Sequence, residues 1–251
     1  MRILVTFALE AEFAPWRKLR SFDRKPLANG RITFFCGAFG EDSVEVLLTG
    51  IGGLRCEETL EAYDALLGGK PDCLISSGLA GALKNVLKPG DLFVPETVRT
   101  LKNDANTQSD IILREGAVLK GAVPINTLIT MTRLVSTAEE KCRLAFFGEA
   151  IDMESAVIMA HFADAAVPKV VIRAISDAAS EDLPIDFDRC VTPQGAIKPL
   201  SLVNAIVRRP GNLPNLVRFG RQSSVAARKL ADFLDQFVVA IFAVRKKAPA
   251  V

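Results

Sequence analysis

Short runs of valine, isoleucine and leucine that end in glycine or a small polar residue recur along the chain. They are Ile3–Ala8, Val44–Thr49, Cys73–Ser77, Leu92–Val94 and Lys169–Ile175. Uninterrupted apolar runs of this length are typical of strands buried on both faces, as in a sheet covered by helices. We therefore expect these segments to form a central sheet.

Segments with apolar residues at helical spacing lie between these runs. Leu54–Leu67 carries Leu60 and Tyr63 at this spacing, and the glycine pair that follows ends the helix. Further helices are expected over Glu154–Ala165 and over roughly Leu216 to Val239. This alternation predicts an α/β protein, a three-layer α/β/α sandwich around a central mixed, largely parallel sheet.

In two stretches the apolar residues follow neither the spacing of a helix nor that of a strand. Arg99 to Asn126 is polar and irregular, which predicts a mobile loop or an excursion of the chain near a site. Pro193–Pro214 contains four prolines and is expected to be a wrapped connection before the last helix. A length of 251 residues suits one hydrophobic core. We expect a single domain over residues 1–251, with a basic C-terminal extension from about residue 193 packed on it.

Composition narrows the class of protein. Hydrophobic residues make up 49% and charged residues 24% of the chain, values typical of globular proteins. No apolar run reaches the roughly 18 residues that a membrane span requires. The first strand resembles the apolar region of a signal peptide, but Glu10 and Glu12 interrupt it too early. A cytoplasmic location is expected.

The net charge of +2 is spread unevenly. No acidic residue occurs from Arg189 to Ala231, which holds the basic residues Arg189, Lys198, Arg208, Arg209, Arg218, Arg221, Arg228 and Lys229. This stretch is either a solvated basic face or a patch that attracts phosphate, nucleic acid or an anionic membrane surface. Phe219 is its only aromatic residue, so nucleic acid is not an expected partner, and a membrane surface is a less favoured one.

Cysteines and histidines give no sign of a metal centre. The five cysteines are Cys36, Cys56, Cys73, Cys142 and Cys190. They form no C-x-x-C pair, so buried free thiols are expected and neither a zinc site nor a disulfide framework is. His161 is the single histidine, which excludes a site built from several histidines, and we interpret it as a helix residue without chemistry. We expect no metal and no cofactor.

Polar residues cluster where the expected strands end, and ligands of open α/β sheets bind at such ends. The segment that begins at Gly50 has a G-x-G pattern, but Arg55 stands where a dinucleotide-binding loop has its third glycine. No phosphate-binding loop of the G-x-x-x-x-G-K-[ST] type is present either. These glycines fit tight turns, or a backbone that comes close to a small ligand such as a sugar.

Six segments together resemble the nucleoside phosphorylase and nucleosidase superfamily, especially the 5′-methylthioadenosine/S-adenosylhomocysteine nucleosidases. The segments, in the family's order, are Ala8–Glu12, Gly50–Gly52, Ser77–Gly81, Leu87–Asp91, Asp152–Ala156 and Val171–Asp177. The resemblance implies an enzyme that cleaves the bond between a purine and a ribose. It also implies a homo-oligomer, commonly a dimer whose partner chain completes the pocket.

The resemblance implies roles for four residues in the reaction. Asp177 would protonate N7 of the departing purine, with Ser176 orienting it, and Glu12 would take a proton from the attacking water. Arg173 would lie near that water and the ribose. A carboxyl group that acts as an acid needs a raised pKa, which an enclosed apolar site supplies. From the residues alone, Asp177 also fits a helix N-cap, and Glu12 an exposed position on an amphipathic helix.

The resemblance also implies the residues around the sugar. Glu154 would bind the ribose 2′- and 3′-hydroxyls, and Met153 would line the sugar. A carboxylate suits this role because it accepts both hydroxyl protons and its charge stabilises a ribosyl cation. Glu154 also fits a favourable anion in the first turn of a helix.

The chain departs from the family pattern at several places. Leu79, next to Gly78, stands where these nucleosidases have a serine near the sugar or water. The aromatic residue that stacks on the purine is replaced near Leu134 and Val135, which predicts aliphatic packing against the base. Phe187 and Ile51 would line the cavity for the 5′ substituent. These changes leave the exact substrate open.

Three functions remain open. Hydrolysis is favoured because the carboxylate of Glu12 activates water and repels phosphate. A phosphorylase with inorganic phosphate as co-substrate would need cationic donors such as Arg55 or Arg173. The tail Gly195–Arg221 is similar to hopanoid-associated phosphorylase-like proteins, which remove adenine from an adenosyl lipid, and a basic tail suits such a substrate. A nucleoside-binding protein without activity is the third reading, because fold does not fix function.

Overall fold

The computed structural model describes residues 1–27, 32–67, 69–102, 105–163, 166–184 and 213–247. Phe187, Cys190 and most of the proline-containing stretch, residues 193–212, lie outside the described part. The strands are β1 (Arg2–Phe7), β2 (Asp23–Leu27), β3 (Ile32–Phe39), β4 (Asp42–Leu48), β5 (Cys73–Ala82), β6 (Leu92–Thr100), β7 (Asn106–Gln108), β8 (Val123–Thr130), β9 (Ala150–Asp152) and β10 (Lys169–Asp177). The helices are α1 (Glu10–Leu19), α2 (Gly53–Leu67), α3 (Ile111–Leu119), α4 (Ala138–Leu144), α5 (Ser155–His161) and α7 (Leu213–Lys247).

The strands form one mixed sheet in the order β10-β6-β8-β9-β5-β1-β4-β3-β2, with β7 added beside β6. Strand β1 lies parallel to β4 and β5, and β10 lies parallel to β5. The predicted α/β fold around a mixed sheet is confirmed. The pairing of β10 with both β5 and β6 closes β5, β9, β8, β6 and β10 into a ring, a feature that the sequence did not predict.

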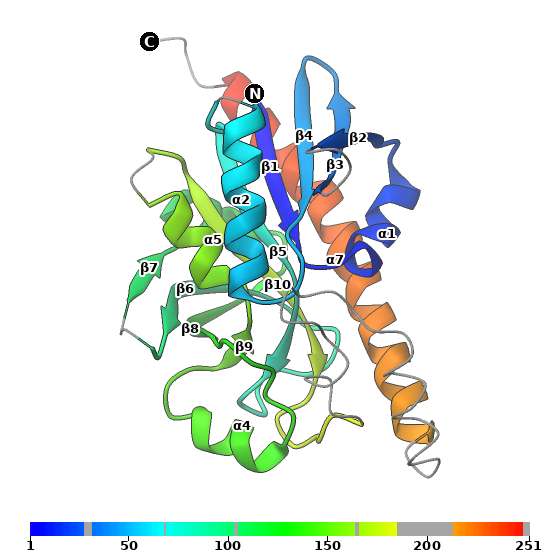
Figure 1. Cartoon of the computed structure of the whole chain (residues 1–251), viewed down its shortest axis with the longest axis vertical. Helices are drawn as coiled ribbons and strands as arrows, with labels where there is room; N and C mark the ends of the chain where they lie inside the picture. The colour runs from blue at the N-terminus through cyan, green and yellow to red at the C-terminus, as the bar shows by residue number, and fades with distance from the viewer. Residues whose placement is uncertain (28–31, 68, 103–104, 164–165, 185–212, 248–251) are drawn as a thin grey trace.

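Helices cover both faces of the open part of the sheet (Figure 1). On β1, Ile3 and Val5 pack in the cluster that contains residues of α1, α3 and α7. Leu4, between them, packs instead with residues of α2 and α5. Successive side chains of a strand point to opposite faces, so an uninterrupted apolar run is what a sheet buried on both sides requires.

The prediction of a loop over Arg99–Asn126 is wrong. This stretch contains β7, α3 and the ends of β6 and β8. Asp110 caps α3, and its side chain accepts hydrogen bonds from the backbone N–H groups of Ile112 and Leu113. Helix α3 is short and buries few of its apolar side chains, so its pattern is too weak to reveal a helix in the sequence.

The helix boundaries also differ from those predicted. Helix α5 ends at His161, before Ala165, and α7 begins at Leu213 and continues to Lys247. Pro214 therefore belongs to the first turn of α7, where a proline is tolerated because its missing N–H has no helical partner. Within the described residues, no helix is long and apolar enough to cross a membrane.

Candidate active site

A cavity of about 1210 Å³ opens where β1, β4, β5 and β10 end. Glu12, Glu154 and Asp177 all line it, although they come from α1, the start of α5 and the end of β10. Each of the three side chains is less than 10% exposed. The sheet therefore brings three buried carboxyl groups, far apart in sequence, to one cavity.

Glu12 is held by backbone donors on both oxygens. Its Oε2 accepts hydrogen bonds from the N–H groups of Ala8 (3.1 Å) and Leu9 (3.0 Å), and its Oε1 from that of Leu79 (3.0 Å). Burial raises the pKa of Glu12, while Arg173 and the three N–H donors oppose this shift. The alternative of an exposed helix residue is wrong for Glu12. Its carboxyl group is fixed in place and is a stronger base than a solvated glutamate.

Glu154 precedes the first residue of α5, and its Oε1 accepts a hydrogen bond of 2.7 Å from the N–H of Gly52. Burial raises the pKa of Glu154 to about 8, with a further contribution from the nearby carboxylate of Asp152. Arg173 and the Gly52 N–H act in the opposite direction. The backbone at Gly52, between β4 and α2, therefore lies directly against this carboxyl group.

Replacing Glu154 by glutamine is expected to make the protein more stable at alkaline pH. The pKa of Glu154 in the folded state, about 8, lies above the ordinary glutamate pKa of 4.5. The part of the unfolding free energy that depends on Glu154 should therefore be fully present below pH 4.5. It should fall as the pH rises and reach its minimum above pH 8. At pH 8.5 we expect Glu154→Gln to exceed the wild type by several kcal/mol, and at pH 4.5 to match it, in urea unfolding.

The exposed Glu58, on α2, provides a matched control, because Glu58→Gln should not change this pH dependence. A difference between wild type and Glu154→Gln that stays constant from pH 4.5 to 8.5 would show that Glu154 has an ordinary pKa.

Arg173 lies behind the carboxyl groups, and neither it nor Gly78 is among the lining residues of the cavity. Its guanidinium donates to Asp152 Oδ2 (3.0 Å from Nε) and to the hydroxyls of Ser76 and Ser155. Gly78 pairs with Arg173 in the sheet and has a φ of +141°; a Cβ there would lie 2.6 Å from Arg173 Nη1. Glycine is therefore required at this position for the arginine to fit.

Asp177 ends β10 and is not a helix N-cap. Its Oδ1 accepts a hydrogen bond of 2.5 Å from the hydroxyl of Ser176, and its Oδ2 forms an ion pair of 2.6 Å with Lys141 Nζ. The absence of a side chain at Gly81 leaves room for this carboxyl group, because a Cβ there would lie 3.0 Å from Asp177 Oδ2. Both oxygens of the carboxyl group thus have a polar partner, and the hydroxyl of Ser176 also lies 3.2 Å from the carbonyl oxygen of Ala80.

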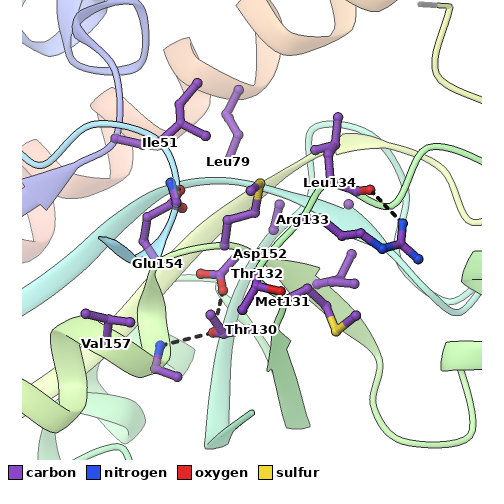
Figure 2. Close-up of a pocket in the computed structure, with 18 of the residues that line it drawn as sticks. Ile51, Leu79, Thr130, Met131, Thr132, Arg133, Leu134, Asp152, Glu154 and Val157 are labelled. Atoms are coloured by element: carbon purple, nitrogen blue, oxygen red, sulfur yellow. Dashed lines mark hydrogen bonds between the residues drawn. The ribbon is translucent and has the colours of Figure 1, made fainter. Parts of the chain in front are cut away.

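Most of the remaining predicted site residues line the same cavity, among them Ser176, Met153, Ile51, Leu79, Leu134 and Val135. In Figure 2, Ile51 and Leu79 lie on the side nearest α7, and Asp152 and Thr130 lie on the opposite side. Phe187 lies outside the described residues. Ile51 and Leu79 therefore give the cavity an apolar wall on the side of α7.

Two buried charged residues at the site were not assigned a role from the sequence. Asp152 binds Arg173, and its Oδ1 accepts a hydrogen bond of 2.6 Å from the hydroxyl of Thr130 (Figure 2). Lys141, on α4, is fully buried. Asp152 belongs to the motif around Glu154 and could have been suspected, but nothing in the sequence around Lys141 indicates burial. In the described part of the chain, no group of three or more His, Cys, Asp or Glu residues could hold a metal ion.

A family model described as the phosphorylase superfamily matches residues 2–208. The chain belongs to this superfamily. The resemblance inferred from the six motifs is confirmed, and so is the expectation of an enzyme of the nucleoside phosphorylase and nucleosidase type. The similarity of the C-terminal tail to hopanoid-associated proteins stays a prediction.

Relatives in this superfamily are distant in sequence but align with most of the chain. A 5′-methylthioadenosine/S-adenosylhomocysteine nucleosidase of Buchnera aphidicola (subsp. Schizaphis graminum) is 25% identical over 83% of this chain and 97% of its own. An aminodeoxyfutalosine nucleosidase of Helicobacter pylori is 24% identical over 74% of this chain and 90% of its own. The crystal structure of a Helicobacter pylori 5′-methylthioadenosine/S-adenosylhomocysteine nucleosidase, with butyl-thio-DADMe-Immucillin-A, has a TM-score of 0.72 at 20% identity, covering 96% of this chain and 98% of that one.

Proposed function

We propose that this enzyme hydrolyses the N-glycosidic bond of an adenine nucleoside and releases the base and the free sugar. The observation that carries the proposal is the convergence of Glu12, Glu154 and Asp177 on one cavity. Breaking this bond leaves negative charge on the purine and positive charge on the ribose. Three carboxyl groups with different surroundings suit the three tasks of protonating the base, holding the sugar and activating water.

Asp177 would serve the base. A carboxyl group beside N7 can donate a proton there, and its second oxygen can accept a hydrogen bond from a 6-amino group. Ser176 and Lys141 fix the orientation of this carboxyl group by donating to its two oxygens. Leu134 and Val135 supply the apolar surface against which the purine ring would pack.

Glu12 and Glu154 would act on the sugar side. Glu12 would remove a proton from water as its oxygen attacks C1′, and its raised pKa improves it as a base. Glu154 would accept hydrogen bonds from the 2′- and 3′-hydroxyls through its carboxyl oxygens. Phosphate would meet Glu12 at the same place and be repelled by it, which supports hydrolysis over phosphorolysis.

The size of the cavity supports a nucleoside with a large apolar 5′ substituent. Small-molecule sites typically measure about 300–1,000 Å³, and this cavity is larger. Beyond the carboxylates, its wall includes Ile51, Leu54, Leu79 and Phe219. An alkylthio group fits this wall, and so does the longer apolar chain of an adenosyl lipid, which is the substrate of the phosphorylase alternative.

Release of adenine from a panel of nucleosides tests the proposal. The panel comprises adenosine, methylthioadenosine, S-adenosylhomocysteine, inosine and 5′-alkylthioadenosines of increasing chain length, each with and without inorganic phosphate. We expect release without phosphate, little turnover of inosine, and a kcat/KM that rises with the apolar 5′ group. Strict dependence on phosphate with formation of a sugar 1-phosphate would establish phosphorolysis instead, and tight binding without any release would indicate a binding protein.

A further inference from the structure

Lys141 places a fully buried ammonium group directly behind the carboxyl group of Asp177. Its side chain is 0% exposed, and its Nζ donates to Asp177 Oδ2 at 2.6 Å. It also donates to the backbone carbonyls of Ala178 (2.9 Å) and Glu181 (2.8 Å). Three acceptors match the three protons of an ammonium group, so the site is built for the charged form of lysine.

The other charged groups near this pair are engaged elsewhere. The Glu181 carboxylate accepts from the Ala178 N–H and faces Arg218 of α7 at 3.4 Å. Asp182 accepts a hydrogen bond from the N–H of Ala138 at the start of α4. On α4 itself, Glu140 pairs with Arg133. Strands β5 and β10 present Gly81 and Ser176 to the carboxyl group, neither of which carries a charge.

This geometry conflicts with the idea that Asp177 carries its own proton and donates it directly to the purine. A hydrogen bond from an ammonium group stabilises the ionised form of a carboxyl group. An anion cannot donate the proton that the departing purine requires. Burial of an ion pair also costs desolvation free energy, and an apolar pair of similar size would be equally stable or more so. The pair therefore calls for a functional explanation.

We propose that Lys141 is a positioning residue that keeps one transferable proton available to Asp177 at neutral and mildly alkaline pH; this inference rests on the proposed function. As the bond from C1′ to the purine breaks, its electron pair moves onto the base. Lys141 transfers a proton to Oδ2 of Asp177, and the neutral carboxyl group so formed passes this proton to N7. Lys141 ends as the neutral amine and Asp177 as the carboxylate, while Glu12 holds the proton taken from water. Proton exchange with solvent after product release returns the site to its starting state.

The pH dependence of kcat/KM for adenine release, from pH 5.5 to 9, tests this inference in the wild type, Lys141→Met and Lys141→Arg. In Lys141→Met, Asp177 must take its proton from solvent, so the defect should be on the order of 10²-fold at pH 8 and shrink steadily toward pH 5.5. Lys141→Arg keeps the charge and the hydrogen bonds but has no proton to give near neutral pH. It should therefore remain as defective as Lys141→Met at pH 8.

Lys84→Met is the matched control, because Lys84 forms an exposed ion pair with Glu149 and does not line the cavity. It should keep the wild-type profile. A Lys141→Met defect that is equal at all pH values, or a Lys141→Arg variant with wild-type activity, would show that Lys141 only holds Asp177 in place; the arginine variant decides this even if the methionine variant does not fold. A wild type that releases no base would overturn the proposed function, and this inference with it.

Discussion

Replacing Asp177 by asparagine is expected to lower kcat for 6-aminopurine nucleosides by about 10²–10⁴-fold, the usual contribution of a group that transfers a proton in the transition state. The amide has nearly the size of the carboxyl group and accepts hydrogen bonds through its oxygen, but it cannot pass a proton to N7. Substrate binding should change much less than kcat. Steady-state kinetics with methylthioadenosine measure both quantities, and a variant with more than a tenth of the wild-type kcat would show that the base is protonated by another group.

The same variant should also be less stable, because it leaves Lys141 buried without its carboxylate. Removing one partner of a buried ion pair typically costs about 3–5 kcal/mol. The double variant Asp177→Asn with Lys141→Met removes the charge as well, and we expect it to regain most of this loss while remaining inactive. Urea unfolding of the wild type, the two single variants and the double variant gives the coupling free energy between Asp177 and Lys141. If the changes in unfolding free energy simply add, the pair does not interact in solution.

Replacing Glu12 by glutamine is the second change with a large expected effect. The amide cannot accept the proton of the attacking water, so kcat should fall by about 10²–10⁴-fold. In addition, the NH2 group of the glutamine would face backbone N–H groups that now donate to the carboxylate, such as that of Leu79. The side chain should therefore also lose its fixed position.

Glu10→Gln is the matched control for this variant, because Glu10 lies two residues earlier on α1 and forms an exposed ion pair with Arg17. It should leave kcat unchanged. Thermal unfolding of both variants separates loss of activity from loss of fold. Nearly full hydrolytic activity in Glu12→Gln would assign the activation of water to another group.

The sequence predicted the parts of the fold that have a strong pattern. The strands β1, β4, β5 and β10 are buried on both faces, so each contains a mostly apolar run, and a strand was correctly predicted at each of these places. Strands β2, β7 and β9 are short or lie at an edge, so none of them stands out in the sequence. The ring formed by β5, β6, β8, β9 and β10 depends on pairings between distant segments, which no local pattern specifies.

The candidate site, like the fold, could be predicted from the sequence only in part. The residue types of Glu12, Glu154 and Asp177 occur in motifs, and the ends of parallel strands bring those motifs together. No pattern in the sequence indicates that Asp177 has a buried cationic partner. Lys141 lies on a short helix rich in charged residues, where lysine is normally solvated, and only the packing of α4 against the segment after β10 buries it.

A crystal structure with an adenine C-nucleoside, whose bond to the sugar is not cleaved, tests most directly whether the three carboxyl groups surround one nucleoside. We expect both ribose hydroxyls to bind Glu154, N7 to face Asp177, and Glu12 to lie on the side of C1′ that water must approach. A nucleoside bound in this cavity with its purine away from Asp177, or with its sugar away from Glu154, would contradict the account.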